Sequence, residues 1–235
     1  MDPENVANLV QFLLRWLHFL FGITWIGLLY YFNLVNGSFL KALDGPTKNK
    51  VVPELMPRVL YYFRWGAVGT WLTGFIYFAW IIGAEKGSHG SLGVWLVIWL
   101  VTWGIIRGLL NPVSGVLNNG MVIGVIVAVL VAVMGFALVK AAGTGFPTNR
   151  TMSIGLGGGL GTLMLLNVWG IIWPHQKRII AWTTEARDKG TAMPPEAAKL
   201  ARRAFLASRM NTWLSLPMLW FMGMASHLPL FNSAQ

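Results

Sequence analysis

The sequence predicts an all-α integral membrane protein: a bundle of six transmembrane helices that forms one domain over residues 1–235. Three features predict this class. Hydrophobic residues make up 55% of the chain and charged residues only 11%, whereas soluble domains carry roughly 25% charged residues. Thirteen Trp and thirteen Phe are typical of aromatic-rich segments that face lipid. Six apolar segments are each close to or longer than the roughly 20 residues that a membrane helix needs.

The first three predicted spans cover residues 6–35, 59–83 and 92–110. Three polar side chains, Gln11, Arg15 and His18, lie within the first of them. The third is expected to end before Pro112, because a proline disfavours helical geometry at the residue that precedes it.

The last three predicted spans cover residues 117–142, 151–173 and 210–230. The fourth is rich in Val, Ile and Ala and carries no charge before Lys140. The fifth is expected to end at Pro174 and the sixth to be kinked at Pro217, because proline interrupts the helical hydrogen-bond pattern.

Two long basic loops, residues 36–58 and 175–209, connect the second span to the first and the sixth to the fifth. With six spans, both loops lie on the same side of the membrane. Basic loops favour the cytoplasm, so we expect both termini outside, in the periplasm, and the protein in a bacterial inner membrane. Within the second loop, Pro195–Arg209 is predicted to be a basic helix that extends the sixth span.

The net charge of +10 has the same explanation. In a soluble protein it would suggest nucleic-acid binding, but here it reflects the basic cytoplasmic segments. We expect the lipid bilayer, and no nucleic acid, among the partners. The chain has no cysteine, which excludes disulfides, iron–sulfur clusters, thiolate zinc sites and covalently attached CxxCH haem.

The predicted spans contain no Asp or Glu. Proton-coupled transporters and pumps normally need carboxylates inside the membrane, so the sequence argues against transport. It also argues against carboxylate metal sites and paired carboxylates for acid–base chemistry. The candidate chemistry therefore rests on histidine, arginine and aromatic side chains.

His18 is the first candidate. Arg15 and Gly22 lie at i−3 and i+4 from it, so the three residues share one face of the first span. The glycine leaves a flat space that a porphyrin or another helix could fill, and the arginine could bind a haem propionate. In the alternative interpretation, His18 binds a carbonyl of a neighbouring helix and Arg15 reaches outward to water.

His227 is the second candidate, near the outer end of the sixth span and at a depth comparable to that of His18. Two histidines from different helices are the usual way in which a membrane bundle holds b-type haem. The pair predicts haem b, with His18 and His227 as the iron ligands. Zinc or copper would need a further ligand, for which only methionines such as Met222 are near, and His227 could instead be an interfacial residue without a ligand.

The segment GLGGGLG at residues 155–161 lies inside the fifth span. No strand precedes it, so it is not a phosphate-binding loop. Small residues in membrane helices favour close helix packing, which is the prediction here. A close approach of the backbone to a flat cofactor is the alternative.

Four stretches together resemble the membrane-embedded N-terminal domain of bacterial membrane-bound urate oxidase. They are RWLHFLFGITWIGLLYYFN (15–33), FRWGAVGTWLTGF (63–75), LGTLMLLNVWGIIWPHQK (160–177) and NTWLSLPMLWFMGMASHLP (211–229). The resemblance implies a membrane domain of an oxidoreductase whose electrons pass to a periplasmic cytochrome c. It also implies that the polar residues shared with the family, His18, Asn167, Asn211 and His227, belong to the site.

The chain also departs from the family's pattern. The family has a carboxylate at the place of Gly66 and histidines near the places of Gly155 and Met210. No cytochrome c domain follows Gln235 in this sequence, so we expect any cytochrome to be a separate protein. Oxidation of urate requires bases that remove protons from a purine, and three of the expected ionisable groups are missing.

Three hypotheses for function remain. The first is a membrane redox subunit that binds haem b and passes electrons to a periplasmic cytochrome or a larger membrane complex. The second is an active urate-oxidase-type enzyme that uses a separate cytochrome c. The third is a non-catalytic accessory subunit of a larger membrane complex. Gly66, Gly155 and Met210 disfavour the second, and the sequence does not separate the first from the third.

Overall fold

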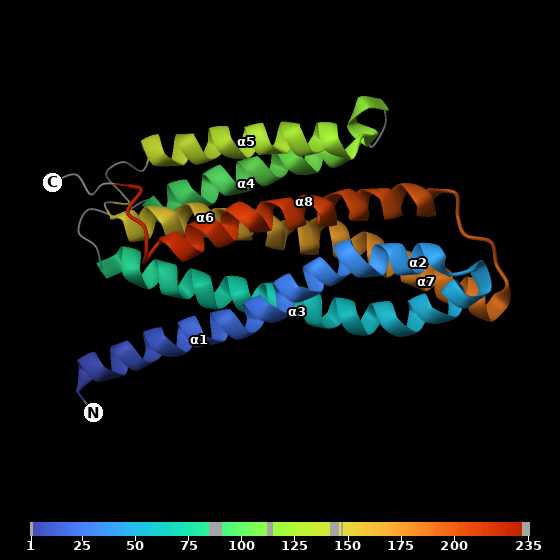
Figure 1. The fold of residues 1–235 in the computed structure, drawn as a ribbon, viewed down its shortest axis with the longest axis horizontal. Coiled ribbons are helices and arrows are strands. Elements are labelled where there is room, and N and C mark those ends of the chain that lie inside the picture. The colour runs from blue at the N-terminus through green and yellow to red at the C-terminus, as the bar shows by residue number, and fades with distance from the viewer. Residues whose placement is uncertain (1, 85–90, 112–114, 142–145, 147, 232–235) are drawn as a thin grey trace.

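The structure, a computed structural model, describes residues 2–84, 91–111, 115–141, 146 and 148–231. Every regular element within these ranges is helical, which confirms the prediction of an all-α protein. The elements are α1 (Pro3–Tyr30), the π-helical turn η1 (Tyr31–Asn36), α2 (Gly37–Ala42), α3 (Gly45–Ala84), α4 (Ser91–Leu110), the 3₁₀ turn η2 (Gly115–Asn118), α5 (Gly120–Ala141), α6 (Asn149–Asn167), the π-helical turn η3 (Val168–Ile172), α7 (Trp173–Lys189) and α8 (Glu196–Met224) (Figure 1).

Five helical segments among the described residues are long and apolar enough to cross a membrane. They are Pro3–Ala42, Gly45–Ala84, Ser91–Leu110, Gly120–Lys140 and Asn149–Lys189, and they correspond to the first five predicted spans. The predicted sixth, α8, is not one of the five, because Arg209 and Asn211 lie in its middle and it ends at Met224 rather than near residue 230.

The two basic connections, residues 36–58 and 175–209, are helical over most of their length. α1 continues through η1 into α2, and α3 begins directly afterwards at Gly45. Asp44 stabilises the start of α3, because its Oδ2 accepts a hydrogen bond from the Thr47 amide at 3.2 Å. Hydrogen bonds from the side chain and backbone of Thr47 lower the pKa of the Asp44 carboxyl.

The helix does not end at Pro174, where the fifth span was expected to end, but continues to Lys189. Pro174 lies in the first turn of α7, where the missing amide hydrogen is tolerated, and the wider turn η3 precedes it. The carbonyl of Gly170, four residues before the proline, accepts a hydrogen bond from Arg107 Nη1 at 2.8 Å instead. The helix ends at Gly190, which adopts φ 68°, a left-handed conformation that favours glycine.

Three of the membrane-spanning segments have 40 or 41 residues and are therefore about 60 Å long, twice the roughly 30 Å hydrocarbon core of a bilayer. Figure 1 shows that α2, α7 and the first part of α3 lie together at one end of the bundle. The start of α1 and the end of α8 lie at the opposite end. The basic segments thus form a helical extension on one side, and the basic helix predicted over Pro195–Arg209 is confirmed as the first half of α8.

The glycines of residues 155–161 pack α6 against its neighbours, which confirms the prediction of close helix packing. A Cβ atom at Gly157 would lie 3.2 Å from the Met218 carbonyl of α8. A Cβ atom at Gly159 would overlap the indole ring of Trp99, on α4. The absence of side chains at these positions lets α6 lie close to both helices.

We expect Gly159→Ala to destabilise the protein. The added methyl group would displace the fully buried ring of Trp99, and overpacking of this kind costs about 1–3 kcal/mol. The measurement is the unfolding temperature of the purified protein in detergent. Gly124→Ala is the matched control, because a Cβ atom there has nothing within 4 Å; equal unfolding temperatures for the two variants would contradict this packing.

Candidate functional site

A cavity of about 760 Å³ lies among α1, α3, α4, α6 and the last part of α8. Its size falls within the range of roughly 300–1,000 Å³ that is usual for ligand pockets. It lies in the half of the bundle that holds the start of α6 and the end of α8 (Figure 1). The ring-bearing side chains of its wall include Trp25, Trp71, Phe75, Phe78 and Trp95. Among the described residues, its arginines and histidines are Arg15, His18, Arg150 and His227.

His18 projects from α1 into this cavity and is half-buried. Its Nδ1 lies 2.8 Å from the Thr70 carbonyl oxygen, on α3. Because a carbonyl oxygen can only accept, Nδ1 carries the proton in this bond and Nε2 keeps its lone pair. The bond matches the alternative interpretation of His18, and it is also the bond that orients a metal-binding histidine.

Gly74 provides the flat space beside the imidazole. A Cβ atom at Gly74 would lie 2.7 Å from His18 Cε1 and 2.8 Å from Nδ1, so only a glycine permits this contact. Gly22, to which the sequence assigned that role, also lines the cavity. Its Cβ atom would, however, meet Thr70 Cγ2 at 3.8 Å rather than the histidine.

Two arginines from different helices gather around one tyrosine at the edge of the cavity. The Cζ atoms of Arg15 and Arg150 lie 5.8 Å and 5.5 Å from the ring centroid of Tyr77. Arg150 also donates a hydrogen bond to the Tyr77 hydroxyl. Tyr77 is buried, with 8% of its surface exposed, whereas both arginines are exposed.

No carboxylate compensates these charges within the described part of the chain. None of the described residues that line the cavity is Asp or Glu. The ion pairs of the described residues join Arg58, Arg178 and Arg187 to Glu54, Asp188 and Glu196. All of these lie on the helical extension, so the arginine-bearing side of the cavity carries a positive field that attracts anions.

His227 lines the same cavity as His18, but it does not lie on a helix as predicted. α8 ends at Met224, and the amide of His227 donates to the Met224 carbonyl at 3.0 Å within a turn. Asn149, at the start of α6, holds the following segment: its Nδ2 donates to the Leu228 carbonyl at 3.1 Å, and its Oδ1 accepts from the Leu230 amide at 2.9 Å. The side chain of His227 is exposed, and its position is determined by this turn.

Asn167 and Asn211 lie outside the cavity, although the sequence grouped them with the cofactor-binding residues. Both are fully buried, and Asn167 Nδ2 donates to Asn211 Oδ1 at 2.8 Å. Asn211 Nδ2 in turn donates to the Met164 carbonyl at 2.9 Å. The two amides therefore join α6 to α8 instead of facing the cavity.

The three positions at which the family's ionisable groups are expected, Gly66, Gly155 and Met210, do not line the cavity either. A Cβ atom at Gly66 would lie 3.3 Å from the backbone nitrogen of Trp25. A Cβ atom at Gly155 would lie 3.5 Å from Cζ of Phe78, and Met210 is buried. In this chain all three are packing positions.

Sequence reasoning missed Arg150 and Tyr77. Arg150 lies just before the predicted fifth span, where a charge is an ordinary feature of a helix end. Tyr77 has no charged residue within four positions along the chain. The contact that joins them connects residues that are 73 positions apart, and it has no local signal.

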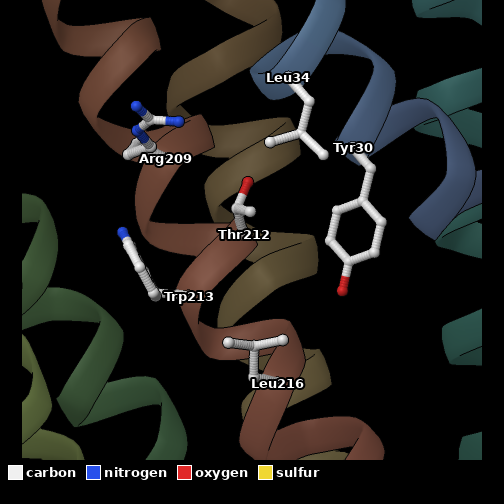
Figure 2. A pocket seen from close by; sticks show the side chains of 6 residues that line it. All are labelled: Tyr30, Leu34, Arg209, Thr212, Trp213 and Leu216. Atoms are coloured by element: carbon white, nitrogen blue, oxygen red, sulfur yellow. The ribbon is translucent and has the colours of Figure 1, made fainter.

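A second, smaller hollow of about 330 Å³ lies between α8 and the junction of α1 with η1. Figure 2 shows Arg209, Trp213 and Leu216 on α8 across from Tyr30 and Leu34. Leu34 and Trp213 are 65% and 64% exposed, as expected of side chains that face lipid. None of the predicted site residues lines this hollow, and Arg209 is the one charged side chain among the described residues that line it.

No group of three or more His, Asp or Glu that could hold a metal ion occurs in the ranges that the structure describes. Haem iron takes one or two protein ligands and does not need such a group.

Comparison with known proteins identifies the family of the chain. Neither the curated proteins nor the solved structures give a match. The family described as "Urate oxidase N-terminal" matches residues 4–235. This match covers nearly the whole sequence and agrees with the resemblance of the four stretches. The chain therefore belongs to the urate oxidase N-terminal family.

Proposed function

We propose that this protein is a membrane redox subunit that binds haem b in the cavity of about 760 Å³ and passes electrons to a periplasmic cytochrome or a larger membrane complex. The observation that carries the proposal is the hydrogen bond from His18 Nδ1 to the Thr70 carbonyl at 2.8 Å. It fixes the tautomer and the orientation of a histidine that lines a largely aromatic cavity.

The residues present fit haem b. His18 Nε2 would be one iron ligand and His227 the other, since both line the cavity. Haem supplies one-electron chemistry, and the protein tunes it through the ligands and the polarity around them. The aromatic wall keeps water from the buried side, and the contact of His18 with Gly74 holds the imidazole plane in place.

A visible absorption spectrum of the purified full chain, before and after addition of haem, tests the proposal. We expect bands of haem b that sharpen on reduction. A well-folded protein that stays colourless and does not take up added haem would overturn it, and would favour an accessory subunit.

A second candidate function is oxidation of urate with a separate cytochrome c as electron acceptor. The cavity gives it specific support, because two arginines and a histidine face an aromatic space that suits a flat anion.

We further propose that α8 is a sixth span and that both termini are periplasmic, in a bacterial inner membrane. The support is the helical extension, where basic residues gather at the end of the bundle opposite the start of α1 (Figure 1). Positively charged segments favour the cytoplasmic side.

We expect a single cysteine in place of Glu4 to react with a membrane-impermeant thiol reagent in intact cells. A single cysteine in place of Lys189 should react only after lysis. Both positions are exposed, and the chain has no native cysteine, so the background is clean. Labelling of Lys189→Cys in intact cells would contradict the proposed orientation.

A further inference from the structure

We infer that Arg15, Tyr77 and Arg150 form a site for carboxylate groups, so that the cavity takes a flat, apolar ligand with a carboxylate at one edge. The inference deepens the proposed function and rests on it in so far as haem, with its two propionates, is the ligand.

The charges of the cluster need an anionic partner. The guanidinium groups of Arg15 and Arg150 lie near the same tyrosine ring, at 5.8 Å and 5.5 Å from its centroid. Two like charges gathered around one ring repel each other, most strongly where the surroundings are apolar. Because no acidic side chain among the described residues lines the cavity, none of these residues offsets the repulsion, and a bound anion would.

The hydrogen-bonding groups of the cluster match a carboxylate. Each guanidinium has five donors and no acceptor. The oxygen of Tyr77 accepts from Arg150, which leaves its own O–H free to donate to a ligand. An ionised carboxylate only accepts, and its hydrogen bonds with arginine are among the strongest in proteins.

The rest of the wall matches a flat apolar body. Trp71 and Phe75 stack with their ring centroids 4.8 Å apart and their planes 9° apart. Phe78, one residue after Tyr77, contacts Trp95 with a centroid separation of 5.4 Å. The aromatic rings therefore adjoin the arginines. A ligand with its body against the rings and its carboxylate on the exposed arginines would keep the charged end near water.

Two kinds of ligand share this chemistry: haem through its propionates, and a small free aromatic acid. The experiment compares them with the full chain purified in detergent. Haem b, haem b dimethyl ester and 2-naphthoate are titrated into the wild type and into the double variant Arg15→Gln/Arg150→Gln, with absorbance for the haems and tryptophan fluorescence for the acid. Arg209→Gln, at the other hollow, is the matched control.

We expect the wild type to bind haem b about ten-fold more tightly than its dimethyl ester, as charged hydrogen bonds allow. The double variant should lose this preference while its affinity for the ester stays the same, and Arg209→Gln should behave like the wild type. Because both arginines are exposed, we expect the fold to persist. Arg150→Lys, which keeps the charge, should retain most of the preference.

The remaining outcomes separate the two proposals. If both haems bind equally well to the wild type, the carboxylate site is wrong and the haem proposal stands. If neither haem binds but 2-naphthoate binds to the wild type and not to the double variant, the carboxylate site is supported with a small acid as its ligand, and the haem proposal fails. If none of the three binds, both are overturned.

Discussion

Replacing His18 with alanine is expected to abolish the visible spectrum of bound haem. The imidazole is held by the Thr70 carbonyl at 2.8 Å and rests on Gly74, and no other histidine on a described helix lines the cavity. Its removal leaves the iron without its oriented ligand. The measurement is the absorption spectrum of purified protein after addition of haem and reduction.

His227→Ala is expected to have a smaller effect on the same spectrum. This residue lies in a turn and its side chain is exposed, so its loss should change a six-coordinate iron to a five-coordinate one and shift the bands without removing them. His175→Ala is the control, because His175 lies in α7 and does not line the cavity. Unchanged spectra for both His18→Ala and His227→Ala would exclude this pair as iron ligands.

The fold could be predicted largely from the sequence, because apolar length decides where a chain crosses a membrane. Five of the six predicted spans correspond to helical segments long and apolar enough to cross a membrane. The helix ends were not predictable in the same way. Pro174 lies within a continuous helical segment, because the turn η3 precedes it and Arg107, from α4, satisfies the Gly170 carbonyl. A contact between separate helices has no signature in the local sequence.

The candidate site, too, could be predicted only in part from the sequence. Arg15, His18 and His227 all line one cavity, and they were found because ionisable groups stand out in apolar segments. Asn167 and Asn211 were grouped with them, but their amides bind each other at 2.8 Å. Pairing of two polar residues from different helices depends on tertiary structure, and so does the hydrogen bond from Arg150 to Tyr77.

The isolated chain is expected not to consume urate, even with a soluble cytochrome c as electron acceptor. The cavity can attract the anion through Arg15 and Arg150, but binding alone does not accelerate a reaction. Removal of a proton from a purine needs a positioned base. Among the described residues, the lining offers only two histidines as bases, His18 through Nε2 and the exposed His227, and no carboxylate to activate either of them.

The measurement is the decay of urate absorbance in the presence of the purified chain, with His18→Ala as the control for a background rate. We expect the two rates to be equal. Adding the family's ionisable groups as Gly66→Glu, Gly155→His and Met210→His should not create activity, because none of these positions lines the cavity. At position 66 there is also little room for a side chain, because a Cβ atom would lie 3.3 Å from the backbone of α1. Turnover by the unmodified chain that His18→Ala abolishes would instead establish the urate-oxidising function and make His18 its base.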